Sequence, residues 1–171
     1  MTDYVALLRG VNVGGVNIKM ADLAEVVRGL GYTDVKTLLA SGNVLFTTPD
    51  AASAATKALE AALRDRFGYE AWVHVLTVDA IRTIIAAYPY QRLADRHAYV
   101  VFAVKPEVRS ELLAVTLDPA IEQAKAGDGV IYWSVPKGST LDSAMGKAQS
   151  RASYKPWITT RNLNTLEKLA G

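Results

Sequence analysis

Residues 4–20 run Tyr-Val-Ala-Leu-Leu-Arg-Gly-Val-Asn-Val-Gly-Gly-Val-Asn-Ile-Lys-Met. The first five are apolar and have the length of a β-strand, and from Met20 onward apolar residues recur at the three-to-four spacing of an amphipathic helix. A glycine-rich loop therefore joins a strand to a helix. Such a junction attracts anions, because amides exposed by the glycines, the unpaired amides of the first helical turn and the helix dipole all favour negative charge.

The segments that follow extend this beginning to a β-α-β-β-α-β order. The helix ends at Gly31. Beyond it the pattern predicts a hairpin of two strands, a second amphipathic helix and a further strand, over residues 35–39, 44–47, 55–67 and 71–76. The common fold with this order is the ferredoxin-like fold, in which helices cover one face of an antiparallel sheet.

The second half of the chain repeats most of this order. After a linking helix, the pattern predicts a strand, a helix, a hairpin and two further helices, over residues 78–87, 98–104, 106–113, 121–126, 130–135, 141–148 and 163–170. We therefore predict an α+β protein of two ferredoxin-like halves with antiparallel sheets and an extra C-terminal helix. The first half with its linking helix would span residues 1–90, and the second half residues 91–171.

Strand directions in this fold bring two distant loops together. Right-handed crossovers make the first and second strands parallel, with the third strand returning between them. The end of the first strand and the turn of the first hairpin therefore lie at the same edge of the sheet. We expect residues 9–19 to face the Ser41-Gly42-Asn43 turn across a shallow groove.

This groove is the predicted binding site for a small phosphorylated or carboxylated molecule, such as a nucleotide. Basic side chains would recognise the charge, glycines would let backbone amides approach the ligand, and amide or hydroxyl side chains would orient it. The candidate residues are Arg9, Asn12, Gly14, Gly15, Asn17, Lys19, Ser41 and Asn43, with Arg161 as a second clamp. The loop has neither the Gly-Lys-Ser/Thr ending of a Walker A motif nor the spacing of a Rossmann fingerprint.

Two other interpretations stay open. From Lys137 onward six basic residues stand against two acidic ones, so this segment could bind nucleic acid or a regulatory partner. Nucleic acid is the less favoured ligand, because the strand at residues 44–47 lacks the aromatic alternation with which RNA-recognition modules stack bases. Alternatively the polar loops only stabilise the fold of an interaction scaffold. Either Thr160 or Asn162 is expected to cap the last helix.

The composition limits the chemistry. There are no cysteines, and the two histidines, His74 and His97, have no carboxylate or second histidine at ligand spacing, so neither a metal site nor a cofactor is predicted. No paired carboxylates or activated nucleophile stand out, and catalysis stays unassigned. The chain shows no basic leader and no apolar run of membrane length, and we expect a cytoplasmic protein that does not bind membranes.

Several motifs together resemble the bacterial family of domain of unknown function 1697. They are the Arg-Gly-Val-Asn-Val-Gly-Gly loop at residues 9–15, Lys19-Met20 with Leu23, the Ser41-Gly42-Asn43 turn, and Thr160-Arg161-Asn162 with Asn164-Thr165. The resemblance covers essentially the whole chain and implies two related α+β halves, without an agreed activity. The sequence departs from the family at Ala40, where glutamine is frequent, and at Leu163, where tryptophan is frequent.

Overall fold

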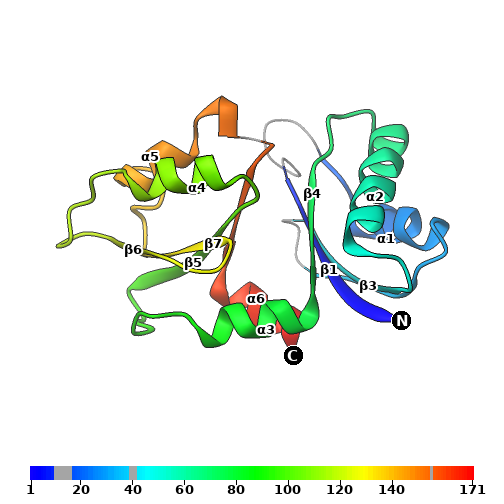
Figure 1. Cartoon of the computed structure of the whole chain (residues 1–171), viewed down its shortest axis with the longest axis horizontal. Coiled ribbons are helices and arrows are strands. Elements are labelled where there is room, and N and C mark those ends of the chain that lie inside the picture. Colours follow the sequence, from blue (N-terminus) through cyan, green and yellow to red (C-terminus); the bar gives the residue numbers. More distant parts are fainter. Residues whose placement is uncertain (10–16, 39–41, 155) are drawn as a thin grey trace. The chain divides into compact units, whose positions relative to one another are not determined.

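The computed structural model describes residues 1–9, 17–38, 42–154 and 156–171. The chain separates into two compact units, Met1–Ile81 and Arg82–Gly171, and each contains a four-stranded sheet (Figure 1). The division falls inside helix α3 (Val78–Ala86), which connects the two units along the chain. The boundary after residue 90 that the sequence suggests stays a prediction.

The first unit has the predicted β-α-β-β-α-β order. Its elements are β1 (Thr2–Leu8), α1 (Met20–Gly29), β2 (Thr33–Thr37), β3 (Asn43–Thr48), α2 (Ala52–Phe67) and β4 (Val73–Thr77). The strand order is β2-β3-β1-β4, and every neighbouring pair is antiparallel. Strands β1 and β2 therefore run parallel on either side of β3, which is the ferredoxin-like arrangement that the sequence predicts.

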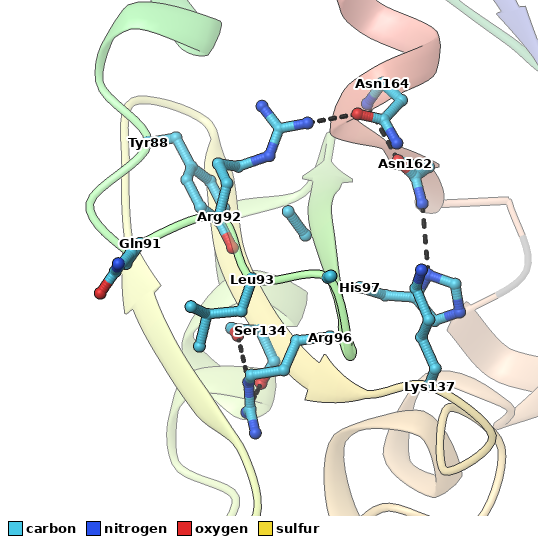
Figure 2. A pocket seen from close by; sticks show the side chains of 12 residues that line it. Tyr88, Gln91, Arg92, Leu93, Arg96, His97, Ser134, Lys137, Asn162 and Asn164 are labelled. Carbon is cyan, nitrogen blue, oxygen red and sulfur yellow. Dashed lines mark hydrogen bonds between the residues drawn. The ribbon is translucent and has the colours of Figure 1, made fainter.

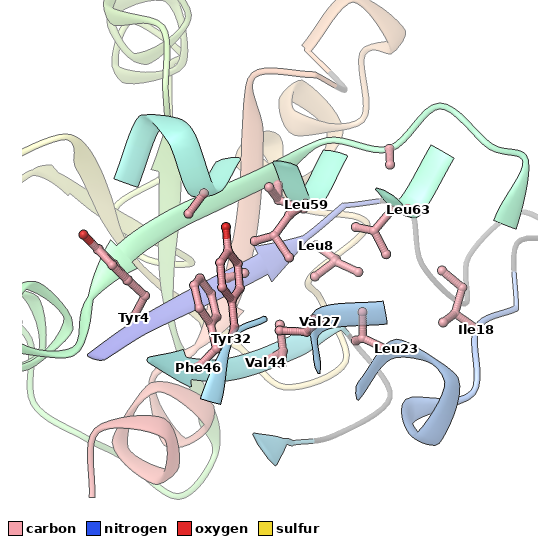
Figure 3. Packing of buried hydrophobic residues seen from close by; sticks show 14 residues of the cluster. Tyr4, Leu8, Ile18, Leu23, Val27, Tyr32, Val44, Phe46, Leu59 and Leu63 are labelled. Atoms are coloured by element: carbon pink, nitrogen blue, oxygen red, sulfur yellow. The ribbon is translucent and has the colours of Figure 1, made fainter. Parts of the chain in front are cut away.

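The core of the first unit lies between the sheet and the two helices α1 and α2 (Figure 3). Alternate side chains of β1 and β3 face the helices, and the helices contribute residues three and four positions apart. The buried cluster includes Tyr4, Ala6, Leu8, Leu23, Val27, Val44, Phe46, Leu59 and Leu63. Because successive side chains of a strand point to opposite faces, the other β1 residues lie on the face of the sheet that is turned away from α1 and α2.

The second unit has the same architecture. Its elements are β5 (Arg96–Ala103), α4 (Pro106–Leu113), β6 (Gln123–Ala126), β7 (Val130–Pro136), α5 (Ala144–Gln149), a 3-10 turn (Ala152–Tyr154), β8 (Ile158–Asn162) and α6 (Leu163–Ala170). The strand order β6-β7-β5-β8 repeats that of the first unit, and its neighbouring strands are also antiparallel. The α+β fold class with two ferredoxin-like halves is confirmed, together with the extra C-terminal helix.

Strand β8 was not among the predicted elements. Residues 159–162 were expected only to precede the last helix, but they pair with β5 and complete the second sheet. The β-branched run from Ile158 to Thr160 favours a strand once a partner is present. The capping prediction is nevertheless confirmed, since the side chain of Asn162 accepts a hydrogen bond from the amide of Asn164 at 2.9 Å.

Helix α5 begins later than predicted, at Ala144 and not at residue 141. Its start is fixed by Ser143, whose hydroxyl accepts from the amide of Gly146, and by the buried carboxylate of Glu122. That carboxylate accepts from the amides of Ala144 at 2.9 Å and Met145 at 3.3 Å. The start of α5 thus depends on a residue from another part of the chain.

None of the described helices combines the length and apolar character needed to cross a membrane.

Candidate functional site

The end of β1 meets the turn that precedes β3, as the strand directions predict. Leu7 pairs with Asn43 in the sheet, and the amide of Leu8 donates to the carbonyl of Gly42 at 2.8 Å. Gly42 has a φ of +83°, in the left-handed region that favours glycine. The amide of Arg9 donates to the carbonyl of Trp72 at 3.1 Å. Arg9 and the Gly42-Asn43 turn therefore lie at the same edge of the first sheet.

The remaining loop residues are only partly described. Asn12, Gly14, Gly15 and Ser41 lie outside the described residues. Asn17 and Lys19 are exposed, and Lys19 occupies the N-cap position of α1 without a side-chain capping hydrogen bond. Ile18 between them is buried in the core of the first unit. It directly precedes the N-cap, and a residue at that position typically packs against the fourth residue of the helix, here Leu23. This anchor leaves Asn17 and Lys19 at the surface where the loop enters the helix.

Arg9 and His74 share the face of the first sheet that lies opposite α1 and α2. His74 and Asn43 both pair with Leu7, and residues directly opposite one another in an antiparallel pair lie on the same face. Continuing the alternation along β1 places Arg9 on this face as well. His74 was not among the predicted site residues, because its relation to Arg9 depends on the register between β1 and β4.

The guanidinium of Arg9 is incompletely satisfied. Its Nη1 atom is buried and has no hydrogen-bond partner within the described part of the chain. Burial lowers the pKa of Arg9 to about 10, so the group stays charged at neutral pH. Burial, and secondly the charge of Arg9, lower the pKa of His74 to about 4. At pH 7 this edge therefore combines a partly buried cation with a neutral imidazole.

Asn43 is built into the turn. Its side chain is fully buried, and Nδ2 donates to the carbonyl of Leu38 at 2.9 Å. The backbone carbonyl of Asn43 accepts from the amide of Leu38, also at 2.9 Å. These two hydrogen bonds hold the two ends of the 38–43 connection together. The contact that the structure shows for the Asn43 amide is thus with the chain itself.

Arg161 belongs to the second unit. It lies on β8 opposite Val100 and is 7% exposed. Its Nη1 atom donates to the hydroxyl of Thr159 at 2.6 Å and to the carbonyl of Thr160 at 3.1 Å. Its predicted role as a second clamp stays a prediction.

Among the residues described, no three histidine, cysteine, aspartate or glutamate side chains gather as they would around a metal ion.

The two antiparallel sheets have the same strand order, which defines this molecule as an α+β protein made of two related ferredoxin-like halves. The chain belongs to the family described as "Protein of unknown function (DUF1697)", whose model matches residues 1–132. It is similar in fold to a solved structure, the conserved bacterial protein SP0830 from Streptococcus pneumoniae, with a TM-score of 0.82 and 24% identity, over 99% of this chain and 97% of that chain. A comparison with curated proteins gives no match.

Proposed function

We propose that this protein binds a small phosphorylated or carboxylated molecule, such as a nucleotide, at the edge of the first sheet where Arg9 follows β1. The observation that supports this most directly is the buried Nη1 atom of Arg9, which has no acceptor among the described residues. An unpaired buried donor costs about 1–3 kcal/mol, and more when it is charged. An anionic oxygen that accepts from Nη1 would remove this cost.

The surroundings of Arg9 suit such a ligand. The Gly42-Asn43 turn lies at the same edge, and the loop that returns to the fold at Asn17 and Lys19 begins at Arg9. The glycines within that loop would bring backbone amides to the same anion, a part of the proposal that rests on the sequence alone. Lys19, at the other end of the loop, would add a second positive charge.

His74 provides a measurable consequence of binding. The positive charge of Arg9 helps to keep the pKa of His74 at about 4, and an anion bound at Arg9 would oppose that effect. We therefore expect the pKa of His74 to rise on binding. By linkage, the affinity for the anion should then increase as the pH falls toward the range in which His74 titrates.

Thermal shift and calorimetric titration test the proposal with three probes: inorganic phosphate, adenosine monophosphate and succinate, at constant ionic strength. A ligand at a hundred times its dissociation constant stabilises the folded protein by about 2.7 kcal/mol. The stabilisation should be reduced in Arg9→Gln and unchanged in Arg28→Gln, which removes an exposed arginine from the last turn of α1.

The histidine signals offer a second readout. Because the chain has two histidines, proton NMR can follow His74 directly once its signal is assigned by its loss in His74→Gln. A shift in the titration of His74 that is lost in Arg9→Gln supports the site. An unchanged His74, or equal loss of binding in the two arginine variants, would contradict it. Oligonucleotide binding that falls steeply with salt and survives Arg9→Gln would favour the basic C-terminal segment instead.

A further inference from the structure

The second unit contains a positively charged pocket, and two of its lining residues, Asn162 and Asn164, belong to the C-terminal motif. It has a volume of about 360 Å³ and lies where β5 begins, β7 ends and β8 passes into α6 (Figure 2). Three basic side chains line it, from Arg92, Arg96 and Lys137. His97, Asn162 and Asn164 are also part of the wall, and no described lining residue is acidic.

Arg96 is held in place by neutral groups. Its Nε atom donates to the hydroxyl of Ser134 at 2.9 Å, and Nη2 donates to the carbonyls of Ile121 at 2.7 Å and Ser134 at 3.0 Å. Hydrogen bonds to carbonyl and hydroxyl oxygens fix the orientation of a guanidinium without cancelling its charge. Arg96 therefore contributes a fixed positive charge to the wall of the pocket.

The other two cations lie nearer the surface. Arg92 forms an ion pair with Glu167 at 2.9 Å, with both side chains close to half exposed, and it also donates to the side chain of Asn164. An ion pair at such exposure contributes about 0–1 kcal/mol, so a ligand can compete for Arg92 at small cost. Lys137 is exposed, and its backbone amide is fixed by the carbonyl of Asp95 at 2.9 Å.

The first turn of α6 adds donors to the same wall. Asn162 caps the helix, and Asn164 stands in its first turn, so both lining amides mark the N-terminal end of α6. Asn162 Nδ2 also lies 3.5 Å from Nδ1 of His97 (Figure 2). The helix end carries partial positive charge, which adds to that of the three basic side chains.

We infer that this pocket binds a phosphate monoester of a small polar molecule, at a site separate from the one proposed at Arg9. A phosphate monoester carries a charge of about −1.5 to −2 at pH 7 and offers three acceptor oxygens. This charge matches a wall with three cations, one of which is paired with the exposed carboxylate of Glu167. Its volume falls in the range of small-molecule sites. The amide side chains would hydrogen-bond the hydroxyl groups of a sugar-like body.

The test is an NMR titration of the full chain with ribose 5-phosphate, with inorganic phosphate and succinate as comparison probes. We expect saturable shifts of the backbone amides of Lys137, Asn162 and Asn164, with ribose 5-phosphate binding more tightly than either comparison probe. Lys137→Gln should weaken ribose 5-phosphate binding about tenfold. The matched control is Lys125→Gln, an exposed lysine on β6 outside the pocket, which should leave the affinity unchanged.

Arg9→Gln separates this site from the proposed function, because it should abolish binding at the first sheet and leave the shifts around Lys137 intact. Loss of those shifts in Arg9→Gln would overturn the assignment of a separate site. The inference would also be overturned by equal weakening in Lys137→Gln and Lys125→Gln, by tighter binding of succinate, or by the absence of saturable shifts at millimolar ribose 5-phosphate.

Discussion

At the scale of single residues, Arg9 combines features that stability alone does not favour. Its guanidinium is charged, and one of its nitrogen atoms is buried without a described acceptor. We predict that Arg9→Met raises the free energy of unfolding by about 1 kcal/mol in phosphate-free buffer, because a partly buried guanidinium with an unpaired nitrogen is replaced by an apolar side chain. Urea denaturation measures the change.

Lys57→Met is the control for this stability change, since Lys57 is exposed on α2 and should shift the free energy of unfolding only slightly. A loss of about 3 kcal/mol in Arg9→Met would show that the guanidinium supports the fold. In that case its unpaired nitrogen would no longer support a ligand site.

Gly146 gives a second test at this scale. A Cβ atom at this position would stand 1.8 Å from the carbonyl oxygen of Thr140 and 2.9 Å from the hydroxyl of Ser143. We expect Gly146→Ala to lower the free energy of unfolding by about 2–3 kcal/mol through overpacking. Gly29→Ala is the matched control, because a Cβ there meets open space and alanine favours the helix. Equal changes in the melting temperatures of the two variants would contradict the close approach.

At the scale of elements, the start of α5 depends on Glu122. This carboxylate is 3% exposed and accepts hydrogen bonds from the indole of Trp133 at 3.0 Å and from two amides of the first turn. Glu122→Ala leaves these donors unpaired, and we expect a loss of about 3 kcal/mol together with faster amide exchange in α5. Glu107→Ala, which removes an exposed acid from the first turn of α4, should cost about 0.5 kcal/mol. Unchanged exchange in α5 would contradict this role of Glu122.

The elements differ in how far local sequence determines them. The strands and helices of the first unit follow from periodicity, and their order determines the ferredoxin-like topology. Strand β8 was missed because threonine and asparagine suit both strands and caps, and only its pairing with β5 decides between them. The start of α5 depends on Glu122, which is distant in sequence. Local periodicity contains neither kind of long-range information.

The candidate sites show the same limit. The predicted strand directions place Arg9 at the same edge of the sheet as Gly42, and the hydrogen bond from Leu8 to Gly42 agrees with this. The position of His74 on the face of Arg9 required the register of β1 with β4, which the sequence does not provide. The pocket of the second unit combines Arg92, Lys137 and Asn164 from three separate segments, and the motif that contains Asn164 does not indicate the other two.

At the scale of the whole molecule, His74 couples folding to pH. Its pKa is about 4 in the folded chain and about 6.5 when unfolded, so the unfolded chain binds more protons between these values. The contribution of His74 to the free energy of unfolding is therefore complete above pH 6.5 and decreases as the pH falls toward 4. The slope should reach about 1.4 kcal/mol per pH unit. Urea denaturation at several pH values, compared between the natural chain and His74→Gln, isolates this contribution from other titrating groups.

The same measurement joins the stability of the chain to the ligand proposed for Arg9. Since the charge of Arg9 is the second cause of the lowered His74 pKa, Arg9→Met should reduce the pH slope without removing it, because burial remains. Saturating phosphate should reduce the slope in the natural chain for the same electrostatic reason. It should have no such effect in Arg9→Met, where the anion has no charge to bind. A slope that phosphate reduces equally in both chains would place the anion elsewhere.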